Sequence, residues 1–398
     1  MAEWIECKIS DIGTVVGGAT PSTKKIENYE GGNIAWITPK DLSTLIGRYI
    51  QCGERNITEI GLKSCSTQLL PKNTVLFSSR APIGYVAIAA NEVCTNQGFK
   101  SVISNEATDP LFLFYLLKYN KDKIEAMGSG TTFKEVSGNT MKNIIVRVPS
   151  DKEVQKNIAS ILGTLDDKIE ENERINNNLE QQAMALFKSW FIDFEPFDGQ
   201  VPKAWINGIL GDFVEIKRGG SPRPIQNYLS DSGFHWLKIS DATGISSPFI
   251  NEIKESIIEA GLKKTVYLKS GSLVLSNSAT PGLPKILDID TCIHDGWLYF
   301  PLSKFSNEYL YLYFKHIRDN LIALGNGSVF TNLKTDILKN YPTYLPTKDV
   351  LKEFDGLVQP IFSMILSKTR EIKRLSEIRD TLLPKLMSGE LYVSGIEL

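Results

Sequence analysis

Short loops that combine cations, amides and hydroxyl groups recur along this chain of 398 residues. Arg and Lys side chains pair with guanine, Asn and Gln with adenine, and hydroxyl groups with phosphates, so such loops can contact nucleic acid. Any one of these loops alone is more typical of an ordinary turn, so the prediction depends on where they fall in the chain. The candidate DNA-binding residues are Lys24, Lys25, Lys40, Arg80, Asn96, Gln97, Thr131, Thr132, Lys134, Arg218, Arg223, Lys238, Asn277, Ser278, His294, Asn326 and Ser328.

Signatures of catalysis and of metal binding are missing from the sequence. It has no P-loop, no Gly-rich dinucleotide loop after a strand, no His-Glu-x-x-His and no Gly-x-Ser-x-Gly. The Asn-Pro-Pro-aromatic tetrad expected in an amino-group methyltransferase is also missing. The three histidines are scattered, and none of the five cysteines pair as Cys-x-x-Cys. The sequence therefore predicts no catalytic residue, no metal site, no cofactor in this chain and no disulfide framework.

The charge balance limits how the chain could bind a polyanion. Lys and Arg number 44 and Asp and Glu 46, which excludes binding by bulk charge. Residues 1–150 hold 16 Lys or Arg against 14 Asp or Glu, and residues 201–346 hold 15 against 13, whereas residues 151–200 hold 5 against 11. A polyanion is therefore expected on the two mildly basic segments. The N-terminus lacks a signal-peptide pattern and the apolar runs are too short for a membrane span, so a cytoplasmic protein is expected.

The chain repeats itself at a displacement of about 200 residues. Gly18-Ala19-Thr20-Pro21 matches Gly219-Gly220-Ser221-Pro222, and Trp36 and Asp41 match Trp236 and Asp241. The matches keep their order along the chain, which predicts two copies of one module. Polar side chains differ between the copies at positions whose neighbouring residues match: Arg80 matches Ser278, Asn96 matches His294, and Gln97 matches Asp295. A constant frame with variable polar loops suits two modules that recognise different things.

The residue composition changes once within each copy of the repeat. Residues 1–150 and 201–346 hold short β-branched runs between Gly-, Pro- and Ser-rich turns, which indicates β-rich heads. One amphipathic helix is expected in each head, around 110–125 and 307–322. Residues 151–200 and 347–398 are helical in character. The predicted fold class is α+β, with two β-rich globular domains separated by two long helices.

The helical segments carry apolar residues at alternating steps of four and three, the spacing of a coiled coil. A generic amphipathic helix packed on its own domain is the alternative interpretation. Connectivity makes a pair within the chain antiparallel, with an internal pseudo-twofold repeat, and Pro360 is expected to kink or delay the second helix. Glu170 and Glu173 are expected to be exposed and to dock partner proteins. The predicted seam consists of Ile158, Leu162, Leu165, Ile169, Leu179 and Leu186 in the first helix, and Phe354, Val358, Ile361, Ile365, Leu375 and Leu382 in the second, with polar Asn172, Asn176 and Lys368 in their middles.

Over essentially its whole length the chain resembles the specificity subunit of type I restriction–modification enzymes, HsdS. The resemblance rests on five sequence motifs that occur in the order typical of the family. The second head departs from the first of these motifs and reads Leu275-Ser276-Asn277-Ser278-Ala279-Thr280-Pro281-Gly282. The five motifs are Phe77-Ser78-Ser79-Arg80-Ala81-Pro82-Ile83-Gly84, Thr95-Asn96-Gln97-Gly98-Phe99-Lys100, Gly128-Ser129-Gly130-Thr131-Thr132-Phe133, Phe187-Lys188-Ser189-Trp190-Phe191-Ile192-Asp193-Phe194 and Leu382-Leu383-Pro384-Lys385-Leu386-Met387-Ser388-Gly389-Glu390-Leu391.

The resemblance implies a non-catalytic subunit that recognises double-stranded DNA with a bipartite site. Residues 1–150 and 201–346 would be target recognition domains, each specific for one half-site. Residues 151–200 and 347–398 would be helical spacers that set the spacing and dock two methyltransferase subunits (HsdM). S-adenosylmethionine would belong to HsdM, which methylates adenine N6, and ATP and Mg²⁺ to up to two HsdR motor-nuclease subunits that join for cleavage.

Two other function classes remain open from the residues alone. One is a coiled-coil scaffold whose heads bind peptides or glycans. The other is an enzyme that acts alone, which the missing motifs disfavour. Salt dependence separates DNA binding from peptide binding, because neutralised phosphates make log K fall linearly with log salt concentration.

Overall fold

The computed structural model describes residues 3–130, 134–325 and 333–392. The chain forms two compact units, Met1–Glu170 with Lys373–Leu398, and Glu171–Ile372. Each unit contains one β-rich head together with the segments of both long helices that pack on it. No helix in the described ranges is long and apolar enough to cross a membrane.

The first head contains ten strands and six short α-helices within the described residues. The strands are β1 (Trp4–Lys8), β2 (Gly13–Gly17), β3 (Ile34–Ile37), β4 (Tyr49–Ile50), β5 (Arg55–Ile57), β6 (Val75–Ser79), β7 (Ile83–Ala89), β8 (Cys94–Thr95), β9 (Lys100–Ser104) and β10 (Ile145–Pro149). The helices are α1 (Ile9–Ile12), α2 (Pro39–Ser43), α3 (Glu59–Lys63), α4 (Pro110–Tyr119), α5 (Lys121–Ala126) and α6 (Gly138–Asn143).

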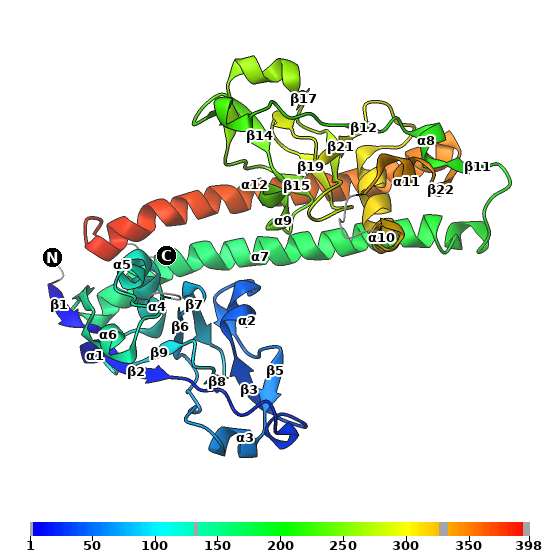
Figure 1. The fold of residues 1–398 in the computed structure, drawn as a ribbon. Helices are drawn as coiled ribbons and strands as arrows, with labels where there is room; N and C mark the ends of the chain where they lie inside the picture. The colour runs from blue at the N-terminus through cyan, green and yellow to red at the C-terminus, as the bar shows by residue number, and fades with distance from the viewer. Residues whose placement is uncertain (1–2, 131–133, 326–332, 393–398) are drawn as a thin grey trace. The chain divides into compact units, whose positions relative to one another are not determined.

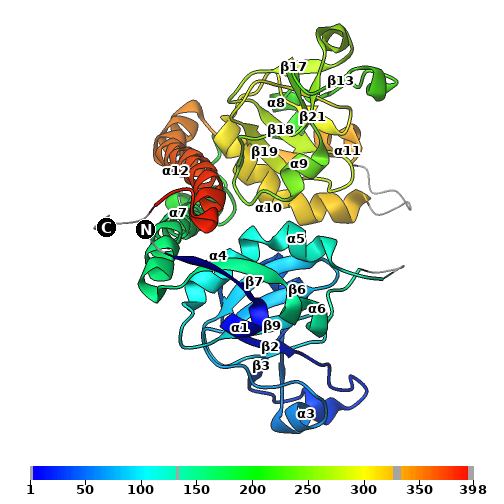
Figure 2. The same ribbon diagram turned by 90° about the vertical axis from the view of Figure 1, so that its left-hand side faces the viewer.

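Three sheets organise the first head. The largest has the order β2-β9-β6-β7-β4, a smaller one has the order β5-β3-β8, and β1 pairs antiparallel with β10. Helices α4 and α5 lie across one face of the sheet that contains β6, β7 and β9 (Figure 2). The single amphipathic helix expected around 110–125 is therefore two helices, which meet at Asn120.

The second head contains twelve strands and four α-helices within the described residues. The strands are β11 (Ile206–Ile209), β12 (Lys217–Arg218), β13 (Leu229–Ser230), β14 (Phe234–Leu237), β15 (Phe249–Ile250), β16 (Ser256–Ile257), β17 (Val266–Leu268), β18 (Leu273–Ser276), β19 (Pro284–Leu287), β20 (Thr291–Ile293), β21 (Trp297–Tyr299) and β22 (Pro342–Leu345). The helices are α8 (Leu210–Phe213), α9 (Ile239–Thr243), α10 (Asn307–Gly325) and α11 (Thr335–Lys339).

The second head repeats the strand order of the first and adds two strands, β13 and β17, at the edges of the smaller sheet. Its order β12-β21-β18-β19-β15 corresponds to β2-β9-β6-β7-β4, and the pair β11-β22 corresponds to β1-β10. The register repeats as well, because Trp36 lies opposite Cys94 in a parallel pair and Trp236 lies opposite Cys292 in the same kind of pair. The internal repeat predicted from the sequence is confirmed in the fold.

The two long helices are α7 (Lys152–Phe191) and α12 (Lys348–Ser388), each unbroken (Figure 1). Because α12 begins ahead of Pro360 and continues past it, the expectation that this proline delays the helix is wrong. A proline removes one backbone hydrogen bond but the tertiary packing on both sides keeps the helix intact. The 40 residues of α7 correspond to about 60 Å at 1.5 Å per residue.

Each head buries its apolar face against these helices. In the first unit Leu116 of α4 shares one core with Ile158 and Leu162 of α7 and with Leu386 of α12. In the second unit the equivalent core contains Phe314, Phe187 and Phe354. Each such side chain stabilises the fold by about 1.5–3 kcal/mol relative to an exposed position. The helices therefore form part of each unit's core.

Within each unit the two helix segments pair antiparallel. In the first unit the start of α7 and the end of α12 pack together, and Arg379 Nη1 donates to Asp166 Oδ1 at 2.7 Å. In the second unit Asn176 Nδ2 donates to Thr369 Oγ1 at 3.3 Å. Asn172 lies in the same seam and is fully buried, and neither polar atom of its side-chain amide has a hydrogen-bond partner within the part of the chain that the structure describes.

The predicted seam is recovered, with one shift. Among its members, those buried are Ile158, Leu162, Ile169, Phe354, Val358 and Ile365, and those half-buried are Leu165, Leu179, Leu186, Ile361, Leu375 and Leu382. Late in α7 the buried positions move one residue along, to Glu180 and Phe187. A straight helix drifts about 20° per heptad relative to a strict 3.5-residue repeat, and here the second head packs on the face that results.

Candidate nucleic-acid interface

The turn between two central strands has the same construction in both heads. The Ser78 hydroxyl accepts a backbone N–H of β7 at 2.8 Å, and the Ser276 hydroxyl accepts the N–H that precedes β19 at 2.9 Å. Arg80 and Ser278 therefore hold the same place in the two frames, as the sequence predicts. One head presents a guanidinium group there and the other a hydroxyl group.

In the second head several predicted residues meet around Asp295. Its carboxylate accepts a hydrogen bond from Ser221 Oγ at 2.6 Å and pairs with Arg223 Nη2 at 3.2 Å. Its backbone carbonyl accepts from Arg218 Nε and, at 3.4 Å, from Asn277 Nδ2. The hydrogen bond from Ser221 is the largest cause that holds the pKa of Asp295 below its ordinary value. The candidate site thus has an ionised carboxylate at its centre.

His294 and Ser278 border the same cluster at Gly296. A Cβ atom on Gly296 would lie 2.2 Å from His294 Cε1 and 2.7 Å from Ser278 Oγ, so a larger residue there would have to displace these two side chains. The N–H of Gly296 donates to His294 Nδ1 at 2.8 Å, which assigns the ring proton to Nε2. Burial lowers the pKa of His294, so the ring is mostly neutral at pH 7. His294 therefore offers a hydrogen-bond donor without a full charge.

The first head repeats this arrangement with different side chains. Gln97, the counterpart of Asp295, accepts from the Thr20 hydroxyl just as Asp295 accepts from Ser221. Asn96 Oδ1 accepts the N–H of Gly98 at 2.9 Å, as His294 does from its own glycine. A neutral amide therefore replaces the carboxylate, and Gly17 and Ser22 stand where the second head has Arg218 and Arg223.

Each head also contains a Lys–Glu ion pair at the residue just before strand β5 or β16. Lys40 Nζ lies 2.7 Å from Glu54 Oε2 in the first head, and Lys238 Nζ binds Glu255 in the second. The two lysines do not correspond, because Lys238 matches Thr38 in the repeat. The two carboxylates do not correspond either, because Glu255 matches Arg55 and Glu54 matches Lys254, so each ion pair belongs to its own head.

Arg80 belongs to a third cluster that holds two residues the sequence analysis did not select. Glu135 Oε2 lies 3.6 Å from Arg80 Nη1, and Glu135 Oε1 lies 3.2 Å from Lys100 Nζ. Lys100 stands in one of the family-typical phrases, so its position was visible in the sequence. Asp295 was visible only as the match of Gln97, and Glu135, Glu54 and Glu255 were not visible, because isolated acidic residues resemble ordinary surface residues until their cationic partners are known.

The other predicted residues divide into two groups. Lys24, Lys25 and Lys134 are exposed, whereas Asn277 is buried and orders its loop. Thr131, Thr132, Asn326 and Ser328 lie outside the described residues. No cluster of His, Cys, Asp or Glu side chains in the described ranges could hold a metal ion.

The acidic helix is partly neutralised by the first head. Glu170 is only 12% exposed, and its Oε1 accepts from the backbone N of Arg48 at 3.0 Å and from Arg48 Nε at 3.1 Å. The expectation that Glu170 is an exposed docking residue is therefore wrong. Counting charge along the helix could not reveal a cation that comes from a loop 122 residues away.

A family model described as "Type I restriction modification DNA specificity domain" matches residues 1–181 and 202–373. The two matches coincide with the two copies of the repeat and cover most of the chain. The chain belongs to this family. The prediction of a type I restriction–modification specificity subunit is confirmed.

Relatives of the full length agree with this assignment. The type I restriction enzyme MjaIX specificity subunit of Methanocaldococcus jannaschii is 36% identical, over 99% of this chain and 95% of that protein. The HindI specificity subunit of Haemophilus influenzae is 26% identical, over 98% of this chain and 100% of that protein. The crystal structure of a type I restriction–modification S subunit from M. genitalium has a TM-score of 0.62 at 16% identity, over 97% of this chain and 96% of that one. That likeness supports the α+β fold of this specificity-family chain.

Proposed function

We propose that this chain is the DNA-recognition subunit of a type I restriction–modification enzyme, and that each head recognises one half of a bipartite site. One observation carries the proposal: equivalent loops on equivalent strands present different side-chain groups for hydrogen bonds to DNA bases. Gln97 faces Thr20 where Asp295 faces Ser221, and the strands that lead into these loops pair in the same register. Amides favour adenine, and arginines held by a carboxylate favour guanine, so the two heads suit different bases.

The partners follow from family membership rather than from any contact in the structure. Two HsdM subunits would bind S-adenosylmethionine and methylate adenine, and up to two HsdR subunits would use ATP and Mg²⁺ to cleave. This chain supplies no catalytic group in the proposal, and a cytoplasmic location remains part of it. Predicted DNA contacts among the loop residues stay predictions.

The long helices would set the distance between half-sites. Each head is fixed to α7 and α12 by a shared core, so head separation depends on helix length rather than on a flexible linker. Half-sites about one helical turn apart, roughly 34–36 Å, would suit two heads on one side of a duplex.

The decisive experiment is co-expression with the methyltransferase subunit, followed by genome-wide mapping of methylated adenine. The proposal predicts one bipartite motif with an unread spacer. Exchange of residues 1–150 for the first head of another family member should change one half-site and leave the other intact. If both half-sites change together, the heads are not independent recognition modules.

A scaffold whose heads bind peptides or glycans is the competing function. Duplex binding by the purified chain separates the two, because DNA binding weakens steeply with salt. Binding to duplex DNA that is unchanged between low and moderate salt would contradict the DNA-recognition proposal.

A further inference from the structure

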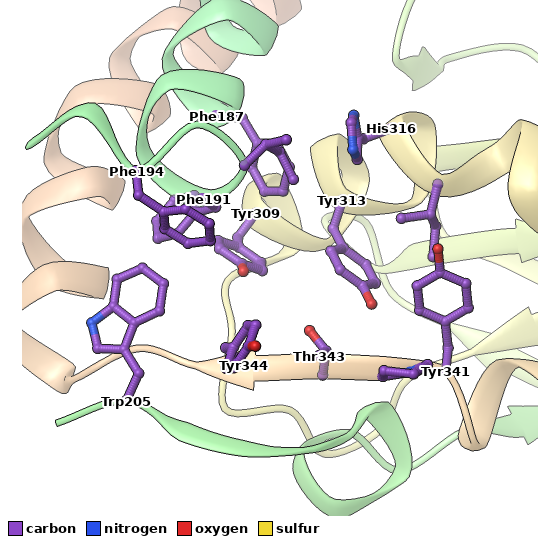
Figure 3. Close-up of a pocket in the computed structure, with 13 residues that line it drawn as sticks. Phe187, Phe191, Phe194, Trp205, Tyr309, Tyr313, His316, Tyr341, Thr343 and Tyr344 are labelled. Carbon is purple, nitrogen blue, oxygen red and sulfur yellow. The ribbon is translucent and has the colours of Figure 1, made fainter. Parts of the chain in front are cut away.

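A recess of about 240 Å³ lies in the second unit, where the end of α7 meets α10 and β22 (Figure 3). Phe191 from α7 and Tyr309 and Tyr313 from α10 form its walls, and Thr343 and Tyr344 from β22 form its floor. Phe191 packs edge-on against Tyr309 with ring centroids 4.9 Å apart. The recess is an aromatic box that opens beside a two-stranded sheet.

One polar group in this box is poorly satisfied. Tyr313 is 6% exposed, and its hydroxyl faces Thr343 but makes no well-formed hydrogen bond with any described residue. Figure 3 shows the hydroxyl groups of Tyr313 and Thr343 pointing into the same space. A buried hydroxyl without a partner costs about 1–3 kcal/mol, so native proteins rarely keep one. The unpaired donor points to a group that enters the recess from outside.

The first unit has a recess at the equivalent place. It has a volume of about 480 Å³ and lies where the end of α12 meets the end of α4 and β10. The correspondence is residue by residue across the repeat. Tyr119, Ile145, Val146, Arg147, Met387 and Ser388 take the places of His316, Pro342, Thr343, Tyr344, Phe191 and Ile192.

The surroundings favour a protein side chain over DNA as the occupant. Among the described residues no Lys or Arg lines the second recess, and burial lowers the pKa of His316, so nothing described there would neutralise a phosphate. Lys123 and Arg147 line the first recess, but both already donate hydrogen bonds to backbone carbonyls, those of Ile145 and Ser388. An exposed apolar side chain lines each recess: Tyr344 is 39% exposed in the second unit, and Ile145 is 52% exposed in the first. Exposed apolar groups around a recess are typical of protein interfaces.

We propose that the two recesses are equivalent anchor sites, each of which receives one apolar side chain from one copy of the methyltransferase subunit. The inference rests on the proposed function, which requires that partner twice, and the recess occurs twice because the module does. The Tyr313 hydroxyl donates to an acceptor next to the anchor, such as a backbone carbonyl of the partner. The anchor fills a space the size of one large side chain.

The test fills each recess separately in the co-expressed complex. Ile192→Trp blocks the second recess and Ser388→Trp blocks the first, whereas Gln200→Trp places the same ring on the exposed surface nearby as a control. Native mass spectrometry should find two methyltransferase subunits on the wild type and on the control, one on each single variant, and none on the double variant. Two subunits bound with unchanged affinity on the double variant would overturn the inference.

A milder variant keeps the test valid if a filled recess fails to fold. Tyr313→Phe removes only the unpaired hydroxyl, so the free chain should be at least as stable while methyltransferase affinity falls on the order of fivefold. Unchanged affinity would overturn the inference. So would mass photometry of the free chain that shows self-association lost on filling, because the occupant would then be a second copy. A wild-type chain that recruits no methyltransferase and yields no methylated bipartite site would instead overturn the proposed function as well.

Discussion

Arg48 and Glu170 fix the first head to α7 through two hydrogen bonds to one carboxylate oxygen, at 3.0 and 3.1 Å. The Arg48 guanidinium is 5% exposed, and its Nη1 also donates to the carbonyl of Gly163 at 2.9 Å and to the Tyr115 hydroxyl at 3.2 Å. Burial alone would lower the pKa of Arg48, but Tyr115, Glu170 and Asp167 together raise it above its ordinary value. One loop residue thus anchors the head to the helix.

Loss of this anchor should destabilise the first unit. Arg48→Met leaves Glu170 largely buried without its cation, and removal of one partner from a buried pair costs about 3–5 kcal/mol. Urea unfolding of the purified chain measures the effect. Lys40→Met, which removes the exposed pair with Glu54, is the matched control and should leave the free energy of unfolding nearly unchanged. Equal effects of the two substitutions would contradict the role assigned to Arg48.

The carboxylate at the centre of the second head should determine base preference. Asp295→Asn keeps an acceptor for Ser221 but removes the charge that holds Arg223, so the arginine becomes free to pair elsewhere. Discrimination at the contacted base pairs in the second half-site should relax, at about 1–3 kcal/mol for each bidentate pair lost. Sequencing of methylated sites checks this. Any change in the first half-site would argue against independent heads.

Exposed lysines on the first head should behave differently from Asp295. Lys24→Ala removes a charge without a role in base recognition, so duplex affinity should fall for all sequences alike. The slope of log K against log salt concentration should become less negative by about one. Fluorescence anisotropy at several salt concentrations measures it, and a variant with altered sequence preference but an unchanged slope would show that Lys24 contacts a base.

Lys285 should give the second unit a distinct pH dependence. The side chain is 2% exposed, and Nζ donates to the carbonyls of Ile245 and Ser247 at 2.6 and 2.5 Å. Burial lowers the pKa of Lys285 to about 8, so the folded chain binds this proton more weakly than the unfolded chain does. Its contribution to the free energy of unfolding therefore rises with pH between about 8 and 10, by up to about 3 kcal/mol.

The variant Lys285→Met isolates that contribution from other titrating groups. The difference in the free energy of unfolding between wild type and variant should move in favour of wild type from pH 7.5 to pH 9.5. Urea titrations of both proteins at the two pH values measure it. A difference that stays constant would show that Lys285 keeps an ordinary pKa in the folded chain.

Sequence patterns predicted the arrangement of domains and long helices because each of these features leaves a regular spacing of residues in the sequence. The repeat near 200 residues, the β-branched runs and the heptad led to two β-rich heads and two long helices. The pattern failed where tertiary packing overrides local rules. Pro360 lies inside α12, and the buried face of late α7 turns from Leu186 to Phe187 because the second head covers it.

The candidate site was predicted only in part, for an electrostatic reason. Cations and amides such as Arg223 and Gln97 stand out in polar loops, so they were selected. Their carboxylate partners, among them Asp295 and Glu135, were not selected. A carboxylate can be assigned to such a site only when the cation that it pairs with is known, and that cation is distant in the sequence. Glu170 shows the converse, since it looked like a free docking residue and is instead paired.

The ruler hypothesis is tested best at the boundary between the two units. An insertion close to Glu170 on its N-terminal side would move that carboxylate away from Arg48, so the helices should be lengthened between Glu170 and Glu171 and between Ile372 and Lys373. One heptad at each point preserves the seam and adds about 10.5 Å at 1.5 Å per residue. If helix length sets the separation of the heads, the preferred spacer should lengthen by about three base pairs at 3.4 Å each.

Because three base pairs also rotate one half-site by roughly 100° at 10–10.5 base pairs per turn, the methylation rate should fall even at the best spacer. The bases of both half-sites should stay the same, which separates a change of spacing from damage to either head. A chain with the heptad in α7 alone is the control, and it should lose assembly because the antiparallel pair slips out of register. Methylated-site sequencing that finds the original spacer in the doubly lengthened chain would show that the helices do not set the distance, and DNA recognition by the heads would stand without the ruler.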